Sequence, residues 1–245
     1  MNNKIEELST ILKNSNNIVF FGGAGMSTES GIPDFRSSNG LFNEKLNLTF
    51  TPEQLVSHSF YMRYPEEFFN FYKAKLIYPN AKPNPGHIAL AKLEKIGKLK
   101  AIVTQNIDGL HQTAGSKNVF ELHGSICRNY CVKCHEFYDE NFLLESMGVP
   151  TCTKCGGSVK PDVVLYEEGL DDNVIRGAVS AIANADTLII GGTSLVVYPA
   201  AGLINYFRGN NLILINKSET TADKKANLVI RDSIGKVLSS AVELL

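Results

Sequence analysis

The sequence predicts a Rossmann-like parallel sheet with helices on both faces, together with a smaller domain that interrupts it. Two observations carry this prediction. Short apolar runs alternate with helical patterns along most of the chain, and all five cysteines lie between positions 127 and 155. The composition is that of a globular protein, since 44% of the 245 residues are hydrophobic and 20% are charged.

Six apolar runs are candidates for the strands of the sheet. Each is short and bounded by turn residues, as buried parallel strands are. The longer runs cover residues 18–21, 101–104, 187–190 and 212–215, and the shorter ones cover residues 119–120 and 228–230. Helical patterns over residues 86–99 and 174–184 lie between them. Near the start of the chain, one face of a further helix collects Ile5, Leu8, Ile11 and Leu12.

Residues 187–207 form an uncharged stretch of membrane-spanning length, yet we expect no membrane span there. Gly191-Gly192-Thr193-Ser194 and Pro199 interrupt the stretch, which predicts a strand, a polar turn and a helix. Residues 1–17 lack the basic start and apolar core of a secretion signal, so we predict a cytoplasmic location. The 24 basic and 25 acidic residues give a net charge of −1, which provides no general attraction for nucleic acid or for an anionic membrane.

Four of the cysteines form the pairs Cys131/Cys134 and Cys152/Cys155, each with two residues between the thiols. This spacing is typical of a zinc site, in which two Cys-x-x-Cys knuckles complete a tetrahedron. Two disulfides or a redox dithiol are the alternatives, and the lack of a secretion signal favours zinc. Four thiolates leave no open coordination position, so one structural zinc ion is predicted.

The remaining cysteine, Cys127, is predicted to be a buried small apolar residue, and His135 is predicted to be exposed rather than a ligand. Residues 127–160 contain four basic and four acidic residues. Because this balance offers nothing to phosphate groups, we interpret the module as a structural zinc ribbon and not as a nucleic-acid finger.

The segments that follow the strands indicate a ligand site. Ligands of such sheets bind beyond the carboxyl ends of the strands, where two glycine-rich turns provide bare backbone amides for a pyrophosphate. The segments are Gly22-Gly23-Ala24-Gly25, Gln105-Asn106-Ile107-Asp108, Gly191-Gly192-Thr193-Ser194 and Asn216. Glycines can also serve tight packing alone, but two such turns with several polar side chains on one edge predict a dinucleotide site. It differs from an ordinary dehydrogenase site, because Thr28 replaces the last small residue of the usual fingerprint and no acidic residue follows a second strand.

Six blocks in this order resemble the motifs of the sirtuins, the NAD-dependent protein-lysine deacylases. The resemblance spans nearly the whole chain and implies a bacterial-type catalytic core. Its blocks are Gly23-Ala24-Gly25-Met26-Ser27, Gly31-Ile32-Pro33-Asp34-Phe35-Arg36, Thr104-Gln105-Asn106-Ile107-Asp108-Gly109-Leu110-His111, Leu122-His123-Gly124, the four cysteines, and Gly192-Thr193-Ser194-Leu195. Two departures are visible: Met26 stands where the family often has isoleucine, and Glu167 stands where it often has glycine.

The resemblance implies a reaction in which the acyl oxygen of the substrate attacks the nicotinamide ribose of NAD. Such a reaction needs one base, and His123 is the predicted one, because an imidazole with a pKa of about 6.5 accepts a proton at neutral pH. The other histidines fit ordinary roles at the surface, at a helix start or in packing: His58, His87, His111 and His135.

The resemblance also assigns the residues around NAD. Asp108 and the Ile107 backbone would hold the nicotinamide carboxamide, and Asn106 would act in catalysis by ordering the ribose and a water. Phe35 would shield the ribose from water, and Arg36 would steer the cover loop and the phosphates. The rest of the dinucleotide site would consist of Gly23, Ala24, Gly25, Thr28 and Gln105, with Gly192, Thr193, Ser194, Asn216 and Ile234 on the adenosine side. The alternatives are a simple Asn-x-Asp-Gly turn, a core position for Phe35 and a surface ion pair for Arg36.

The acylated lysine would lie along Val163, Val164 and Tyr166, with Val164 accepting the N–H of the acyl amide. A plain packed strand is the alternative for this segment. Tyr72 and Lys75 stand where one branch of the family has Tyr-x-x-Arg for acidic acyl groups, although lysine lacks the bidentate fork of arginine.

The predicted division of the chain follows. A large NAD-binding domain would hold residues 1–40, 76–126 and 161–245, and a small domain would hold a helical module over 41–75 and the zinc module over 127–160. The predicted activity is NAD-dependent removal of acyl groups, acetyl foremost, from lysines of proteins or peptides, by a monomer that binds neither nucleic acid nor membranes. Two alternatives stay open: an NAD-dependent ADP-ribosyltransferase or glycohydrolase on the same site, and a zinc-stabilised NAD-binding protein without turnover.

Overall fold

Six parallel strands form the central sheet, in the spatial order β3-β2-β1-β7-β8-β9. The structure is a computed structural model that describes residues 2–37, 40–41 and 50–245. All six predicted apolar runs become strands of this sheet. Their bounds are β1 Ile18–Gly22, β2 Leu99–Thr104, β3 Val119–Glu121, β7 Thr187–Gly191, β8 Asn211–Ile215 and β9 Leu228–Ile230. The chain builds outward on one side through β2 and β3, then crosses to β7, so the strand order reverses between β1 and β7.

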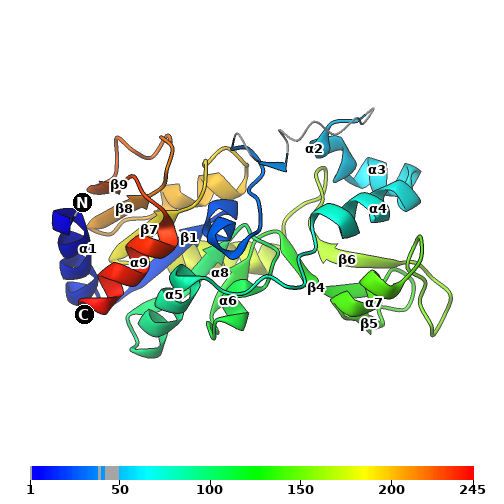
Figure 1. The fold of residues 1–245 in the computed structure, drawn as a ribbon, viewed down its shortest axis with the longest axis horizontal. Helices are drawn as coiled ribbons and strands as arrows, with labels where there is room; N and C mark the ends of the chain where they lie inside the picture. The colour runs from blue at the N-terminus through cyan, green and yellow to red at the C-terminus, as the bar shows by residue number, and fades with distance from the viewer. Residues whose placement is uncertain (1, 38–39, 42–49) are drawn as a thin grey trace.

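Helices cover both faces of this sheet, as predicted (Figure 1). Ile18 and Phe20 of β1 contribute to the core on one face, and Val19 and Phe21 contribute to the core on the other. The strand therefore alternates between two apolar layers, as a strand buried on both sides does. The first face carries α1 (Asn2–Asn14), α5 (Pro85–Lys95) and α9 (Ile234–Glu243); the second carries α8 (Asp172–Asn184) and the 3-10 helix η4 (Ala200–Tyr206).

The predicted helix over residues 86–99 is shorter than expected, because α5 ends at Lys95. Gly97 adopts a φ of +77°, which glycine reaches without steric cost. Its N–H donates to the Glu94 carbonyl at 2.9 Å, and the N–H of Lys98 donates to the Leu93 carbonyl at 3.0 Å. This pair of bonds is a Schellman motif, which closes the helix and releases residue 99 into β2.

A second sheet of three antiparallel strands, in the order β5-β4-β6, lies beside the first (Figure 1). It shares one apolar core with a set of short helices that precede it in the chain. The strands are β4 Gly124–Cys131, β5 Phe137–Tyr138 and β6 Val159–Val163, accompanied by α7 Glu140–Glu145; the helices are α2 Pro52–Leu55, α3 His58–Arg63 and α4 Pro65–Lys75. Strands β4 and β6 both run across the domain boundaries predicted at 126/127 and 160/161, and residues 42–49 of the predicted helical module lie outside the described residues.

Arg128 of β4 joins the two sheets. Its guanidinium donates from Nη1 to Glu121 of β3 at 2.6 Å and from Nε to Asp162 of β6 at 2.8 Å. Two carboxylates on one planar guanidinium fix its direction, so the small sheet is held at a defined angle to the end of the large one.

Residues 187–207 form β7, a polar turn and η4, as predicted. Among the helices that the structure describes, none combines the length and the apolar character needed to cross a lipid bilayer.

Candidate functional site

A cavity of about 960 Å³ opens at the carboxyl ends of the parallel strands, where the strand order reverses. Open sheets of this kind bind ligands at such a reversal, and the volume is at the upper end of the range usual for ligand and cofactor pockets. All the residues predicted to bind NAD or the substrate line this cavity. They are Gly23, Ala24, Gly25, Thr28, Phe35, Arg36, Gln105, Asn106, Ile107, Asp108, His123, Val163, Val164, Tyr166, Gly192, Thr193, Ser194, Asn216 and Ile234.

The two glycine-rich turns lie against each other at the base of the cavity. Gly25 donates its N–H to the carbonyl of Gly192 at 2.8 Å, and a Cβ on Gly25 would lie 2.8 Å from the Gly192 Cα. Gly192 itself has a φ of +61°. The packing alternative therefore explains why glycine is needed at these two positions. Both turns line the cavity, although several of their N–H groups are used inside the protein: those of Gly23, Gly25 and Gly192 donate to other backbone carbonyls.

Gln105 fastens the turn after β7 to the end of β2. Its side-chain nitrogen Nε2 donates to Thr193 Oγ1 at 3.1 Å, and Thr193 Oγ1 also accepts the N–H of Leu195 at 3.2 Å. Two turns from strands on opposite sides of β1 are thus fixed relative to each other.

Asn106 and Asp108 are joined through Ser27. Asn106 Nδ2 donates to Ser27 Oγ at 3.0 Å, and Ser27 Oγ donates to Asp108 Oδ2 at 2.6 Å. The other carboxylate oxygen of Asp108 accepts the N–H of Leu110 at 2.9 Å, at the start of α6 (Leu110–Thr113). Burial raises the pKa of Asp108, although these hydrogen bonds oppose the shift.

Ser27, for which the sequence predicted no role, lies at the centre of this network and on the cavity wall. The available signal was its position next to the glycine-rich turn, where a hydroxyl can reach polar groups at the end of the neighbouring strand. Only the structure shows that those groups belong to Asn106 and Asp108.

His123 lies between β3 and β4 with its ring at the cavity. Its Nδ1 is 3.0 Å from the carbonyl oxygen of Gln105. Because a carbonyl only accepts, Nδ1 carries the proton and Nε2 keeps its lone pair. Burial lowers the pKa of His123 below its ordinary value, although the hydrogen bond that its ring donates to the Gln105 carbonyl opposes the shift. A neutral imidazole with a fixed tautomer is equipped to act as a base.

Phe35 and Arg36, which belong to the predicted cover loop, line the cavity. Arg36 Nη2 donates to the hydroxyl of Tyr166 at 3.3 Å, which connects the cover loop to the segment after β6. At the opposite end, Ile234 lines the cavity while its Cδ1 fills the space beside Gly191, where a Cβ would have no room. Asn216 is oriented by a bond from its Nδ2 to the Ser218 carbonyl at 2.8 Å.

The segment after β6 runs along the cavity and is attached at its start to the histidine. The N–H of Val164 donates to the His123 carbonyl at 3.0 Å. Within the described chain, no backbone N–H donates to the Val164 carbonyl. Lys75 also lines the cavity, whereas Tyr72 is fully buried in the core shared by the helices and the small sheet, away from the cavity wall.

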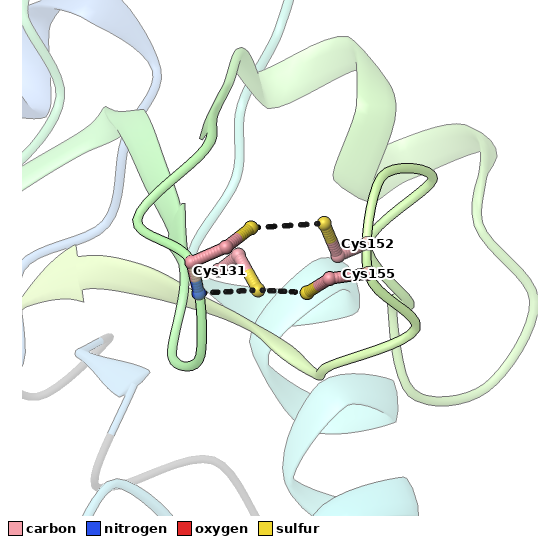
Figure 2. Close-up of side chains that lie close together, drawn as sticks. Cys131, Cys152 and Cys155 are labelled. Carbon is pink, nitrogen blue, oxygen red and sulfur yellow. Dashed lines mark hydrogen bonds between the residues drawn. The ribbon is translucent and has the colours of Figure 1, made fainter.

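Four cysteine thiols meet between the small strands, and Figure 2 shows those of Cys131, Cys152 and Cys155 turned toward one another. All four sulfurs lie within 4.8 Å of each other. The closest pairs are Cys131–Cys155 at 3.4 Å and Cys134–Cys152 at 3.6 Å. Both separations are far above a disulfide bond of about 2.05 Å and close to the roughly 3.8 Å edge of a tetrahedral zinc–thiolate site.

The surroundings of the cluster fit a thiolate-bound ion. The backbone N–H groups of Lys133 and Cys134 point at the Cys131 sulfur at 3.4 and 3.5 Å. The Tyr138 hydroxyl donates to the Cys152 sulfur at 3.2 Å and lowers the pKa of that thiol to about 6. Donors aimed at sulfur stabilise the charged form, which is the form that binds zinc.

The remaining cysteine and histidines are placed as follows. The prediction that Cys127 is buried is wrong: it is exposed, with its sulfur 3.7 Å from Glu140 Oε2, because β4 turns this position toward solvent. His135 is exposed, as predicted. His58 is at the surface, whereas His87 and His111 pack ring against ring in the interior with centroids 4.7 Å apart.

Comparisons with known proteins agree with this geometry. The model of the Sir2 family matches residues 23–199. A protein of Clostridium perfringens (strain 13 / Type A) named NAD-dependent protein deacetylase is 82% identical over 244 residues, which cover 99% of this chain and 100% of that protein.

Two solved Sir2 structures are similar along almost the whole length. One is a complex with a deacetylated p53 peptide and 3′-O-acetyl-ADP-ribose, at 38% identity and a TM-score of 0.89. The other is a complex with a p53 peptide and NAD⁺, at 38% identity and a TM-score of 0.84. In both cases the match covers 98% of this chain and 98% of the other.

Proposed function

The chain belongs to the Sir2 family, and we propose that His123, with the polar groups gathered around it, performs the chemistry of its cavity. The protein removes acyl groups, acetyl foremost, from lysine side chains of proteins or peptides, consuming NAD and yielding nicotinamide and O-acyl-ADP-ribose. The observation that carries the residue assignment is the bond from His123 Nδ1 to the Gln105 carbonyl, which leaves Nε2 free of a proton at the cavity.

NAD supplies the ribose carbon from which nicotinamide departs, and the acyl oxygen of the substrate is the group that attacks that carbon. The structure fits this ligand, since the cavity extends from the two glycine-rich turns to the Asn106–Ser27–Asp108 network. We place the pyrophosphate at these turns, where glycine lets a ligand approach the backbone closely. Asp108, together with the Ile107 backbone, would hold the carboxamide, and Ser27 would keep the Asp108 carboxylate in place.

His123 accepts a proton at Nε2 from a hydroxyl group of the bound ligand. Its neutral state at pH 7 follows from the lowered pKa, and the Gln105 carbonyl keeps the ring from turning. Asn106, which lines the same cavity, would order the ribose and a water. Phe35 and Arg36, which also line the cavity, would shield the reacting groups from bulk water.

The acylated lysine lies along Val163–Tyr166, with its amide N–H donated to the Val164 carbonyl. Two features support this placement: the Val164 N–H is bonded to the residue that bears the base, and its carbonyl accepts no backbone N–H of the described chain. The packed-strand alternative does not explain why six consecutive residues, from Val163 to Glu168, line the cavity. The location of Tyr72 away from the cavity wall argues against the use of its hydroxyl for acidic acyl groups.

The finer points of the assignment rest on composition. We propose a cytoplasmic monomer that binds neither nucleic acid nor membranes, as a net charge of −1 supports. The division into a large domain over residues 1–40, 76–126 and 161–245 and a small domain over 41–75 and 127–160 remains our proposal, supported by the separate cores of the two sheets.

A panel of lysine peptides carrying acetyl, propionyl, succinyl and longer acyl groups, incubated with NAD and followed by mass spectrometry, tests the function. We expect the acetyl peptide to lose its acyl group with equal amounts of nicotinamide and O-acetyl-ADP-ribose. A His123→Ala variant should lose at least about 10²-fold in rate while still binding NAD. ADP-ribose attached to protein, or free ADP-ribose without O-acetyl-ADP-ribose, would instead indicate a transferase or a glycohydrolase. Normal turnover by the variant would remove His123 from the mechanism.

A further inference from the structure

The segment that follows β6 is fastened to the first turn of α3 by the side chain of Glu167. This residue stands where the resemblance expects glycine, and it adopts a φ of +77°, a conformation that residues with a side chain rarely occupy. Its carboxylate oxygen Oε2 accepts two hydrogen bonds from Ser59, from the backbone N–H at 2.8 Å and from Oγ at 2.6 Å. Bonds to a charged acceptor are among the stronger ones in proteins, so they can hold this backbone geometry.

Neighbouring hydrogen bonds also join the segment after β6 to the residues around the start of α3. The Tyr166 N–H donates to the Val56 carbonyl at 3.0 Å, and the His58 N–H donates to the Tyr166 carbonyl at 2.9 Å. The next residue, Glu168, has its Oε1 2.8 Å from Nδ1 of His58, and its Oε2 accepts the N–H of Leu165 at 2.9 Å. The backbone between residues 164 and 168 is therefore bonded to His123 at one end and to the start of α3 at the other.

We propose that Glu167 is a positioning residue. It holds the segment Val163–Tyr166, along which the acylated lysine would bind, in the position that substrate binding requires. The inference rests on the proposed function, because it takes that segment as the substrate's binding strand. Glu167 and Tyr166 both line the cavity, so a shift of the loop at residue 167 moves the wall that the peptide contacts. The glycine-rich turns lie on the large sheet, and in the part of the chain that the structure describes Glu167 bonds to Ser59 rather than to them, so their geometry should not depend on it.

Three substitutions of Glu167 distinguish the effect of losing its carboxylate from the effect of its strained backbone conformation. Glu167→Gly deletes the carboxylate but tolerates the positive φ, Glu167→Ala deletes it and leaves the strain, and Glu167→Gln keeps an acceptor oxygen of the same reach. We expect the KM for an acetylated peptide to rise about tenfold in Glu167→Gly, the scale of one hydrogen bond to a charged group, and at least as much in Glu167→Ala. Glu167→Gln should stay within about threefold of the wild type, since a neutral acceptor makes weaker bonds.

The measurements are kcat, KM for the peptide and KM for NAD, with the melting temperature of each variant. We expect kcat and KM for NAD to change less than about twofold. Ser59→Ala should add nothing when combined with Glu167→Gly, because the Oγ bond that it removes is already lost in Glu167→Gly. Glu66 is an exposed glutamate on the neighbouring α4. Its substitution Glu66→Gln is the matched control, and this variant should behave as the wild type.

An unchanged peptide KM in both Glu167→Gly and Glu167→Ala would overturn the positioning role. So would a parallel rise in the KM values for NAD and peptide with a lowered melting temperature, since that is the signature of general loosening. Either result would leave the wild-type deacylation intact, whereas a failure of the proposed function would already appear as a wild type that does not deacylate the peptide.

Discussion

The two sheets of the molecule are stabilised by different physical means. Every residue of β1 and β7, the central strands of the large sheet, is buried between two apolar layers. The small sheet has one strand of two residues, exposes Phe137 and Tyr130, and converges on four thiols. The groups proposed to bind NAD thus stand on a scaffold held by burial, while one wall of the proposed peptide site belongs to the module that holds the zinc site.

Removal of zinc should give the largest effect and should act on one sheet only. Chelation or a Cys152→Ser substitution takes away the ion whose binding supplies folding free energy to such modules, about 10 kcal/mol or more. We expect deacylation to be lost while NAD binding, measured by calorimetry, remains detectable on the large sheet. Metal analysis should give one zinc ion per chain in the wild type.

Cys127→Ser is the matched control for this experiment, because Cys127 is exposed and stands outside the cluster. It should keep one zinc ion and full activity. Full activity of zinc-free protein would contradict the structural role, and zinc loss in the control would mean that Cys127 takes part in the site.

Two phenylalanines offer a direct test of the contrast in burial. Phe20 is fully buried in the middle of β1, whereas Phe137 of β5 is 54% exposed. Phe20→Ala should lower the free energy of unfolding by about 3–5 kcal/mol through lost transfer energy and a residual cavity. Phe137→Ala should change it by less than about 1 kcal/mol. Urea unfolding followed by circular dichroism measures both, and equal losses would refute the distinction between the sheets.

The sequence predicted the large sheet better than the small one, because strands that are buried on both faces leave a clear pattern in the sequence. Runs such as residues 18–21 are apolar on both faces and therefore recognisable without tertiary information, and the Cys-x-x-Cys pairs carry their own spacing. The exposure of Cys127 and the end of α5 at Lys95 depend instead on which way a strand faces and on a turn closed by Gly97.

At the site, sequence motifs predicted which residues line the cavity but not how they are bonded to one another. The link from Asn106 through Ser27 to Asp108 joins residues about 80 positions apart in the chain, and it exists because β1 and β2 are neighbours. The contact of Glu167 with Ser59 spans 108 positions and has no signal in local sequence. Long-range polar contacts of this kind are set by the folded backbone, so a motif can name their members only after the fold is known.

The two buried histidines, His87 of α5 and His111 of α6, should make the large sheet sensitive to acid. Burial lowers the pKa of His87 to about 4, and burial together with the nearby His87 lowers the pKa of His111 to about 3. In the unfolded chain both histidines would titrate at about pH 6.5. Between that pH and about 4, the unfolded state therefore binds protons at these side chains and the folded state does not. As the pH is lowered through this range, the free energy of unfolding should fall by up to about 1.4 kcal/mol per pH unit for each histidine.

Urea unfolding of the wild type at pH 7.0, 6.0 and 5.0 measures this slope, and a His87→Gln variant should show a smaller one. His135→Gln is the control on the small sheet, because His135 is exposed and its substitution should leave the slope unchanged. Equal slopes in all three proteins would show that the buried pair does not refuse protons.

Activity should respond to acid far less than stability does, because the pKa of His123, the proposed catalytic base, is also lowered. Burial lowers the pKa of His123, so the folded enzyme holds the neutral base over the whole range above about 6.5. We expect kcat/KM for an acetylated peptide to be flat between pH 7 and 8.5 and to keep more than half of that value at pH 6.5. The profile reports the base in the free enzyme. A midpoint above pH 7 would mean that the imidazole is more exposed than the Gln105 contact implies, or that another group controls the rate. Measurement of zinc content at each pH separates a titration at the edge of the large sheet from loss of the metal in the small one.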